Sequence, residues 1–86
     1  MNEIINERVS VVTVYDSSKG VVMPVKLKWA GREYKLEKLG YRHKVRQGRV
    51  LLHIFSVAND TLAFKLEFNT ENLHWVLQEV YDESAA

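Results

Sequence analysis

Cationic side chains gather in the middle of the chain, many of them at alternate positions. Residues 26–49 hold nine Lys or Arg against two Glu, a net charge of +7, whereas residues 1–25 carry −1 and residues 50–86 carry −5. Alternate residues of a strand share a face, so such cations can follow a phosphate backbone beside a ring that stacks on bases. We predict that DNA or RNA binds to a set of basic residues with one aromatic: Lys26, Lys28, Lys35, Tyr41, Arg42, Lys44, Arg46 and Arg49.

The same charges have an interpretation that needs no ligand. A half-buried strand of any soluble protein alternates apolar and charged residues, and outward lysines protect sheet edges from aggregation. The partner of this chain is alternatively a protein or a second copy of the chain, bound at an open sheet edge near Pro24 or at a face formed by Leu52 and Ile54. If the sheet closes, strand 50–58 turns Leu52 and Ile54 outward as an interface; if the sheet folds over on itself, these residues form a second core layer.

Three histidines are the candidate metal ligands. With an odd-length loop between their strands His43 and His53 would face each other, and His74 could approach from the last strand. A zinc site needs three or four ligands in tetrahedral array, and the sequence has no Cys and no H-x-x-H or HExxH spacing. We therefore expect no metal and no cofactor.

Catalytic motifs are absent from the sequence. It contains no nucleophile elbow, no Gly-rich phosphate loop and no evident Ser/His/Asp arrangement. The polar cluster of residues 16–19 is typical of a surface loop, and the paired acids Asp82 and Glu83 lie on the expected tail. We predict that the chain is not an enzyme.

The elements that would position these residues are short strands. Residues 50–68 contain two apolar-rich runs separated by Asn59-Asp60, which predicts a β-hairpin with a two-residue loop. That loop would set Val57 opposite Leu62, Phe55 opposite Phe64, His53 opposite Leu66 and Leu51 opposite Phe68, all on one largely apolar face.

A second hairpin is predicted over residues 21–39 with Ala30-Gly31 as its turn. It pairs Leu27 with Tyr34 inside and places the Lys28–Glu33 and Lys26–Lys35 pairs outside. Pro24 lacks an amide hydrogen, which indicates a sheet edge or a bulge at that position.

Turn signals every 8–12 residues complete the pattern of an all-β domain. Further strands are expected over residues 8–15, 41–46 and 73–81, the last of which could instead be a short helix. The prediction is a single domain of residues 1–86, an antiparallel meander of six or seven strands forming a small barrel or a strongly curled sheet. Residues 1–7 and 82–86 are expected to be frayed.

The segment from Pro24 to Leu36 carries a motif of the form PxxLxWxGRxY, matched by Pro24, Leu27, Trp29, Gly31, Arg32 and Tyr34. It resembles a family of short bacterial domains of unknown function, and Thr70, Trp75, Leu77 and Asp82 are similar to that family's ending. The likeness covers residues 20–82. It departs at Ala30, where family members have a basic or bulky residue, and in the lack of Trp between residues 30 and 74. The resemblance implies an all-β bacterial domain and no catalytic residues.

The composition also bears on location. The chain has no cysteine, no signal-peptide pattern in residues 1–7 and no apolar run of the roughly 20 residues that a membrane helix needs. We expect a cytoplasmic protein without a membrane partner.

Overall fold

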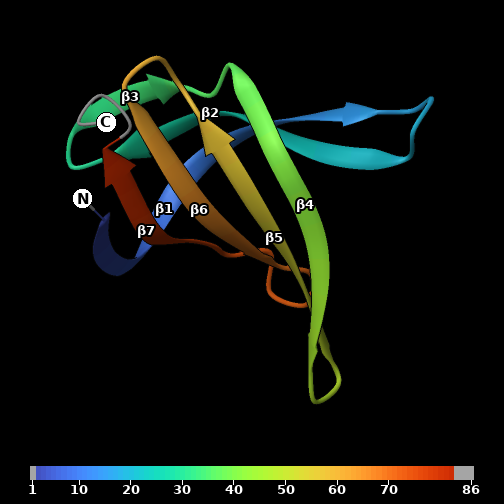
Figure 1. The fold of residues 1–86 in the computed structure, drawn as a ribbon. Helices are drawn as coiled ribbons and strands as arrows, with labels where there is room; N and C mark the ends of the chain where they lie inside the picture. Colours follow the sequence, from blue (N-terminus) through green and yellow to red (C-terminus); the bar gives the residue numbers. More distant parts are fainter. Residues whose placement is uncertain (1, 83–86) are drawn as a thin grey trace.

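The computed structural model describes residues 2–82, which form seven antiparallel strands and no helix (Figure 1). The strands are β1 (Asn2–Asp16), β2 (Val21–Trp29), β3 (Arg32–Lys35), β4 (Lys38–Gln47), β5 (Val50–Ala58), β6 (Leu62–Asn69) and β7 (Trp75–Asp82). They form one sheet in the order β3-β2-β1-β7-β6-β5-β4. The predicted fold class, an all-β antiparallel meander of six or seven strands, is confirmed. This part of the chain has no helix that could cross a membrane.

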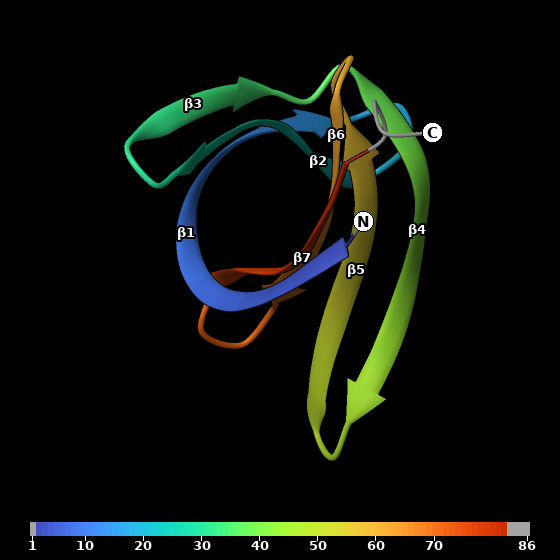
Figure 2. The ribbon, with the colours of Figure 1, turned by 60° about the vertical axis from the view of Figure 1, so that its left-hand side comes forward.

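The two edge strands of the sheet are neighbours in the sequence. β3 ends at Lys35 and β4 begins at Lys38, so Leu36 and Glu37 alone connect opposite edges. An extended chain spans at most about 3.6 Å per residue, so this link keeps the two edges roughly 11 Å apart or less at one corner. The sheet must therefore curl, as the curved β1 and β4 show in Figure 2. It remains open, because β3 and β4 form no ladder with each other within residues 2–82.

β1 joins the two halves of the curled sheet. Its first part pairs with β7 as far as Val9↔Trp75, and its second part pairs with β2 from Ser10 onward. Asn6 lies in a bulge with φ of 54°, a left-handed conformation that Asn tolerates. The expectation that residues 1–7 are frayed is wrong for residues 2–7, because β1 begins at Asn2 and its residues 2–4 and 7 pair with β7. β7 extends through Asp82, and residues 83–86 lie outside the described part of the chain.

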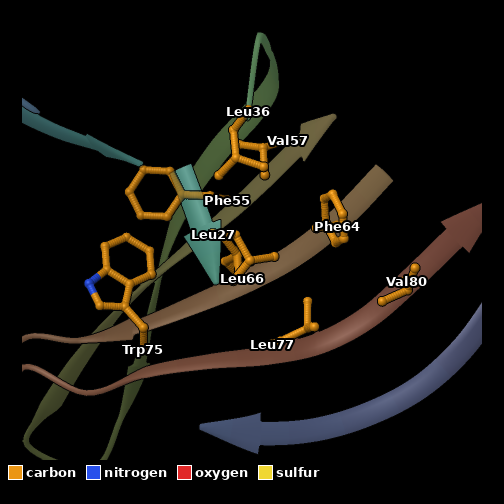
Figure 3. Packing of buried hydrophobic residues seen from close by; sticks show 9 residues of the cluster. All are labelled: Leu27, Leu36, Phe55, Val57, Phe64, Leu66, Trp75, Leu77 and Val80. Carbon is orange, nitrogen blue, oxygen red and sulfur yellow. The ribbon is translucent and has the colours of Figure 1, made fainter. Parts of the chain in front are cut away.

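The core lies between the β2–β3 hairpin and the concave side of β5, β6 and β7 (Figure 3). Phe64 is central to it: its side chain has no exposed surface, and its ring centroid lies 5.3 Å from that of Tyr34 on β3. The buried cluster consists of Leu27, Leu36, Phe55, Val57, Phe64, Leu66, Trp75, Leu77 and Val80. These residues come from both halves of the curled sheet, so curling is what forms the core.

The β2–β3 hairpin has the predicted register. Leu27 pairs with Tyr34 and lies in the core, while the outward residues pair as Lys26↔Lys35 and Lys28↔Glu33. The ion pair forms diagonally rather than directly across: Lys26 Nζ lies 3.8 Å from Glu33 Oε1. The diagonal contact moderates the repulsion of Lys26 by Lys35.

The turn of this hairpin allows a stability prediction. Ala30 has φ of 53° and Gly31 has φ of 76°, the pattern of a type I′ turn, in which alanine is strained and asparagine is favoured. We expect Ala30→Asn to raise the free energy of unfolding by about 1 kcal/mol in urea denaturation.

The matched control for this prediction is Gly31→Ala. A Cβ at Gly31 would meet no atom within 4 Å, so this change tests backbone conformation alone. It should lower the free energy of unfolding by about 1–2 kcal/mol. A destabilising Ala30→Asn would contradict the assigned turn.

Pro24 lies where the sheet tolerates a missing amide hydrogen. Pro24 pairs with Thr13, directly beside a bulge between Val12 and Thr13. The pairing of β2 with β3 stops at Lys26, so β2 is the edge of the sheet at Pro24. The prediction of an edge or a bulge at Pro24 is confirmed in both respects.

The register predicted for the β5–β6 hairpin is wrong by two residues. Ala58 pairs with Ala63 and Phe55 with Leu66, and the Asn59 amide donates to the Leu62 carbonyl (2.9 Å), so the turn is centred on Asp60-Thr61 rather than on Asn59-Asp60. The reason is the Asn59 side chain, whose Oδ1 accepts hydrogen bonds from the amides of Thr61 (2.9 Å) and Leu62 (2.8 Å) and so holds Asn59 at the start of the turn instead of inside it. A register shift of two residues leaves each side chain on the same face of the sheet. The apolar face of this hairpin is therefore the predicted one.

Candidate cationic pocket

The β4–β5 hairpin decides which way the cations of β4 point. Gln47 pairs with Val50, which leaves a two-residue loop in which Gly48 has φ of 63°. Lys44 is then opposite His53 and Arg42 opposite the core residue Phe55. Paired residues share a face, so Arg42 and Lys44, and by alternation Arg46, lie on the concave side. These three residues are called the β4 row below.

Part of the β4 row lines a partly enclosed pocket of about 360 Å³. The pocket lies between the β1–β2 hairpin and the β4–β5 hairpin, both of which project from the molecule (Figure 1). Its lining residues include three cations from the two hairpins and no Asp or Glu: Lys19, Gly20, Val21, Val22, Arg42, Lys44, His53 and Phe68. We call this the cationic pocket; its composition suits an anion.

The turn that carries Lys19 is held by local hydrogen bonds. The Asp16 carboxylate accepts from the Ser18 hydroxyl (2.6 Å) and the Ser18 amide (3.0 Å), and the Gly20 amide donates to the Asp16 carbonyl (2.8 Å). The hydroxyl bond is the main cause of a lowered pKa for Asp16, to which Lys19 adds. Asp16 is therefore engaged at the base of the turn and is not among the pocket-lining residues.

Two rings, those of His53 and Phe68, line the cationic pocket. The ring of Phe68 is stacked on Trp75 with centroids 4.7 Å apart, and His53 meets Phe68 edge to face at 6.4 Å. Burial lowers the pKa of His53, and the positive charges of Lys44 and Arg42 lower it further. His53 is accordingly neutral at pH 7, and the positive charge of the pocket comes from Lys and Arg.

The His53 pKa yields a direct test of the pocket electrostatics. Because a nearby cation disfavours the imidazolium form, we expect Lys44→Gln to raise the pKa of His53 toward 6.5. NMR titration of the imidazole protons measures this. Arg49→Gln, at the tip of the hairpin, is the control and should leave the His53 pKa nearly unchanged; an equal effect of both would mean that only net charge matters.

The lowered pKa of His53 also makes the free energy of unfolding depend on pH. A histidine with a lowered native pKa takes up its proton more readily when unfolded, so its contribution to the free energy of unfolding is present above pH 6.5. That contribution is lost as the pH falls from 6.5 through the native pKa. We expect His53→Phe to flatten this part of the stability–pH curve.

The other predicted site residues are divided between surfaces. Lys26, Lys28 and Lys35 lie on the outward face of the β2–β3 hairpin, since Leu27 between them points into the core. Arg49 is in the β4–β5 turn.

Tyr41 lies on the face of β4 opposite to Arg42 and Lys44. It pairs with Ser56, is 54% exposed and stacks on His43 at 5.5 Å. The structure thus brings Arg42 and Lys44 together and separates them from the predicted stacking residue. The sequence analysis did not predict that Lys19, His53 and Phe68 lie beside Arg42 and Lys44. Only the tertiary fold brings β4, β5 and β6 together with the β1–β2 turn.

The predicted apolar interface is almost covered. Leu52 and Ile54 lie on the convex side of β5, as expected, but they are only 4% and 5% exposed because side chains of β4 and β6 flank them. His43 and Glu67 are the paired neighbours of Ile54. These two residues offer little surface to a partner, and neither joins the main core cluster.

A larger and shallower hollow of about 740 Å³ lies at the bend of β1. Its polar groups are largely paired with one another: Trp29 Nε1 donates to Glu7 Oε2 at 3.0 Å, and the Arg8 guanidinium lies 3.0 Å from the His74 ring nitrogens. Groups that satisfy each other are less available to a ligand, and we regard the cationic pocket as the better candidate site.

The histidines do not converge. The two-residue loop places His43 opposite Ile54 and His53 opposite Lys44, so the two imidazoles lie on different faces of the hairpin. His74 directly precedes β7, and its ring nitrogens lie against the Arg8 guanidinium of β1. Among residues 2–82 no three His, Cys, Asp or Glu side chains are grouped so as to hold a metal ion.

Comparison with known proteins adds no relative: no family model, no curated protein and no solved structure matches the chain. The resemblance to short bacterial domains therefore stays a prediction, and any function rests on the site itself.

Proposed function

We propose that this chain is a non-enzymatic module that binds single-stranded nucleic acid through the cationic pocket and the β4 row. The observation that carries the proposal is the convergence of Lys19, Arg42 and Lys44 on one partly enclosed space that no carboxylate lines. Counterion release by lysine and arginine supplies most of the affinity of such sites for phosphate backbones.

The charges of this site are available to a ligand. Within residues 2–82 the ion pairs are Lys26–Glu33 and Lys65–Glu79, and neither includes a residue of the pocket or the β4 row. Cations without carboxylate partners exchange water and counterions for phosphate at a lower cost than paired ones. The β4 row repeats every two residues, or about 6.7 Å along the strand, and so offers a line of positive charge.

The rings of the pocket favour a single strand over a duplex. Base faces are exposed for stacking only where bases are unpaired. Phe68 is half-buried and backed by Trp75, a rigid arrangement on which a base could stack next to the phosphates held by Arg42 and Lys44. Tyr41, on the opposite face, does not take this part in the proposal.

The experiment is an anisotropy titration of labelled single- and double-stranded oligonucleotides at several salt concentrations. With four cations engaged (Lys19, Arg42, Lys44 and Arg46), the logarithm of the association constant should fall with the logarithm of salt at a slope of about −3 for a single strand. The duplex should bind more weakly. Single-strand affinity that does not change with salt would remove the proposed mechanism.

A second candidate function is a protein interaction at the free edge of β4. β4 has ten residues and pairs only with β5 in the described part of the chain, so one of its sides can accept an added strand. Two copies joined at β4 would bring their rows of Arg and Lys side by side, so a homodimer of this kind requires high salt. Light scattering at low and high salt tests it, and a monomer at both argues against it.

A further inference from the structure

The two ends of the β4 row have different surroundings. Arg46 is opposite Leu51, near the tip of the projecting hairpin, whereas Arg42 is opposite Phe55, which has no exposed surface. From the tip inward, the residues of β5 opposite the row pass from the half-buried Leu51 and His53 to the fully buried Phe55. A strand lying along the row toward Arg42 therefore approaches the packed core on the concave side.

The β1–β2 hairpin borders the inner end of the row. Gly20, Val21 and Val22 line the pocket together with Arg42 and Lys44, and Lys19 contributes a third cation from this second hairpin. Near the tip of the hairpin, each cation of the β4 row would contact one phosphate of a bound strand. At the inner end, three cations surround a single small space.

We infer that the cationic pocket receives the terminal phosphate of the bound strand. This inference rests on the proposed function and specifies its ligand. An internal phosphodiester carries one negative charge, and its strand must continue on both sides of the phosphate. A terminal phosphomonoester carries about −1.5 to −2 charges at pH 7, presents three acceptor oxygens and ends the chain. A terminal group, with its higher charge and no onward strand, suits a partly enclosed space with three convergent cations better than an internal phosphodiester does.

The test compares otherwise identical oligonucleotides that end in a 5′-phosphate, a 3′-phosphate or hydroxyls at both ends, each labelled away from the end under test. We expect one phosphorylated strand to bind the wild-type chain about tenfold more tightly than the strand without phosphate. The preferred end gives the polarity of the strand. A terminal phosphate on either end that leaves the affinity unchanged overturns the inference while the proposed function stands.

Two matched variants locate the effect. Lys19→Gln should weaken the phosphorylated strand more than the unphosphorylated strand and so reduce the phosphate preference to about twofold or less, because Lys19 lines the pocket that receives the end group. Arg46→Gln, on the open part of the row, should weaken both strands by the same factor and keep the preference. A preference that survives Lys19→Gln and disappears with Arg46→Gln would place the end group elsewhere.

One result separates the two proposals. If no oligonucleotide binds at low salt, both are wrong, whereas equal binding of all three strands refutes only the terminal-phosphate inference. An NMR titration of His53 adds a readout without a label: a phosphate in the pocket favours the imidazolium form, so the preferred strand should raise the His53 pKa more than the unphosphorylated strand does.

Discussion

Replacing Arg42 and Lys44 together with glutamate is expected to weaken the binding of single-stranded nucleic acid by about a hundredfold or more. Under the proposed function each side chain would supply a charge-assisted contact of about 1.5–3 kcal/mol, and two such contacts would amount to at least about 3 kcal/mol. The new carboxylates would also repel phosphate from the pocket that these residues line. Anisotropy titration at fixed salt measures the loss.

The matched control for this variant is Lys26→Glu combined with Lys35→Glu. It changes the net charge by the same amount, but on the outward face of the β2–β3 hairpin. Charges farther apart than the Debye length of about 8 Å at physiological salt are largely screened, so the control should lose less than about fivefold. Equal losses in the two double variants would mean that net charge, and not the cationic pocket, attracts the ligand.

Phe64→Ala is expected to lower the free energy of unfolding by about 3–5 kcal/mol. Phe64 is fully buried, pairs with Val57 and Val80 in the sheet, and meets the ring of Tyr34 from the other half of the curled sheet. Removal of the ring leaves a cavity where the two halves meet. Since domains are stable by only about 5–15 kcal/mol, much of the total stability would be lost.

Urea denaturation of Phe64→Ala and of Leu39→Ala measures this effect against a control. Leu39 is 43% exposed, and its removal should cost about 0.5 kcal/mol or less. If Phe64→Ala cost less than about 1 kcal/mol, the β2–β3 hairpin would not be packed against β6 as described.

The residues behind these two predictions, Arg42 and Lys44 in the first and Phe64 in the second, were only partly placed by the sequence analysis. Phe64 was placed correctly on the apolar face of the central hairpin, although its predicted partner, Phe55, was wrong. Arg42 and Lys44 were placed together on one face of β4, which the structure confirms. Their neighbour Lys19 was not connected with them.

Local patterns determine much of this protein. Alternation of apolar and polar residues sets which face of each strand points inward, and it does so even where the register is misjudged by two residues. The Ala30-Gly31 turn sets the β2–β3 register, because a two-residue loop leaves one way to pair its flanking strands. The all-β class and the facing of the cations on β4 follow from such short-range rules.

Features that depend on contacts between strands distant in the sequence are decided only by the tertiary structure. Residues 2–7 become a strand because β7 lies beside them, and Leu52 and Ile54 lose their exposure to side chains on neighbouring strands. Lys19 reaches the pocket because the two-residue link between β3 and β4 curls the sheet and brings the β1–β2 hairpin over the concave side of β4 and β5. Alternation sets the face of a residue, but it carries no information on which distant strand will stand opposite, and that pairing is what assembles the candidate site.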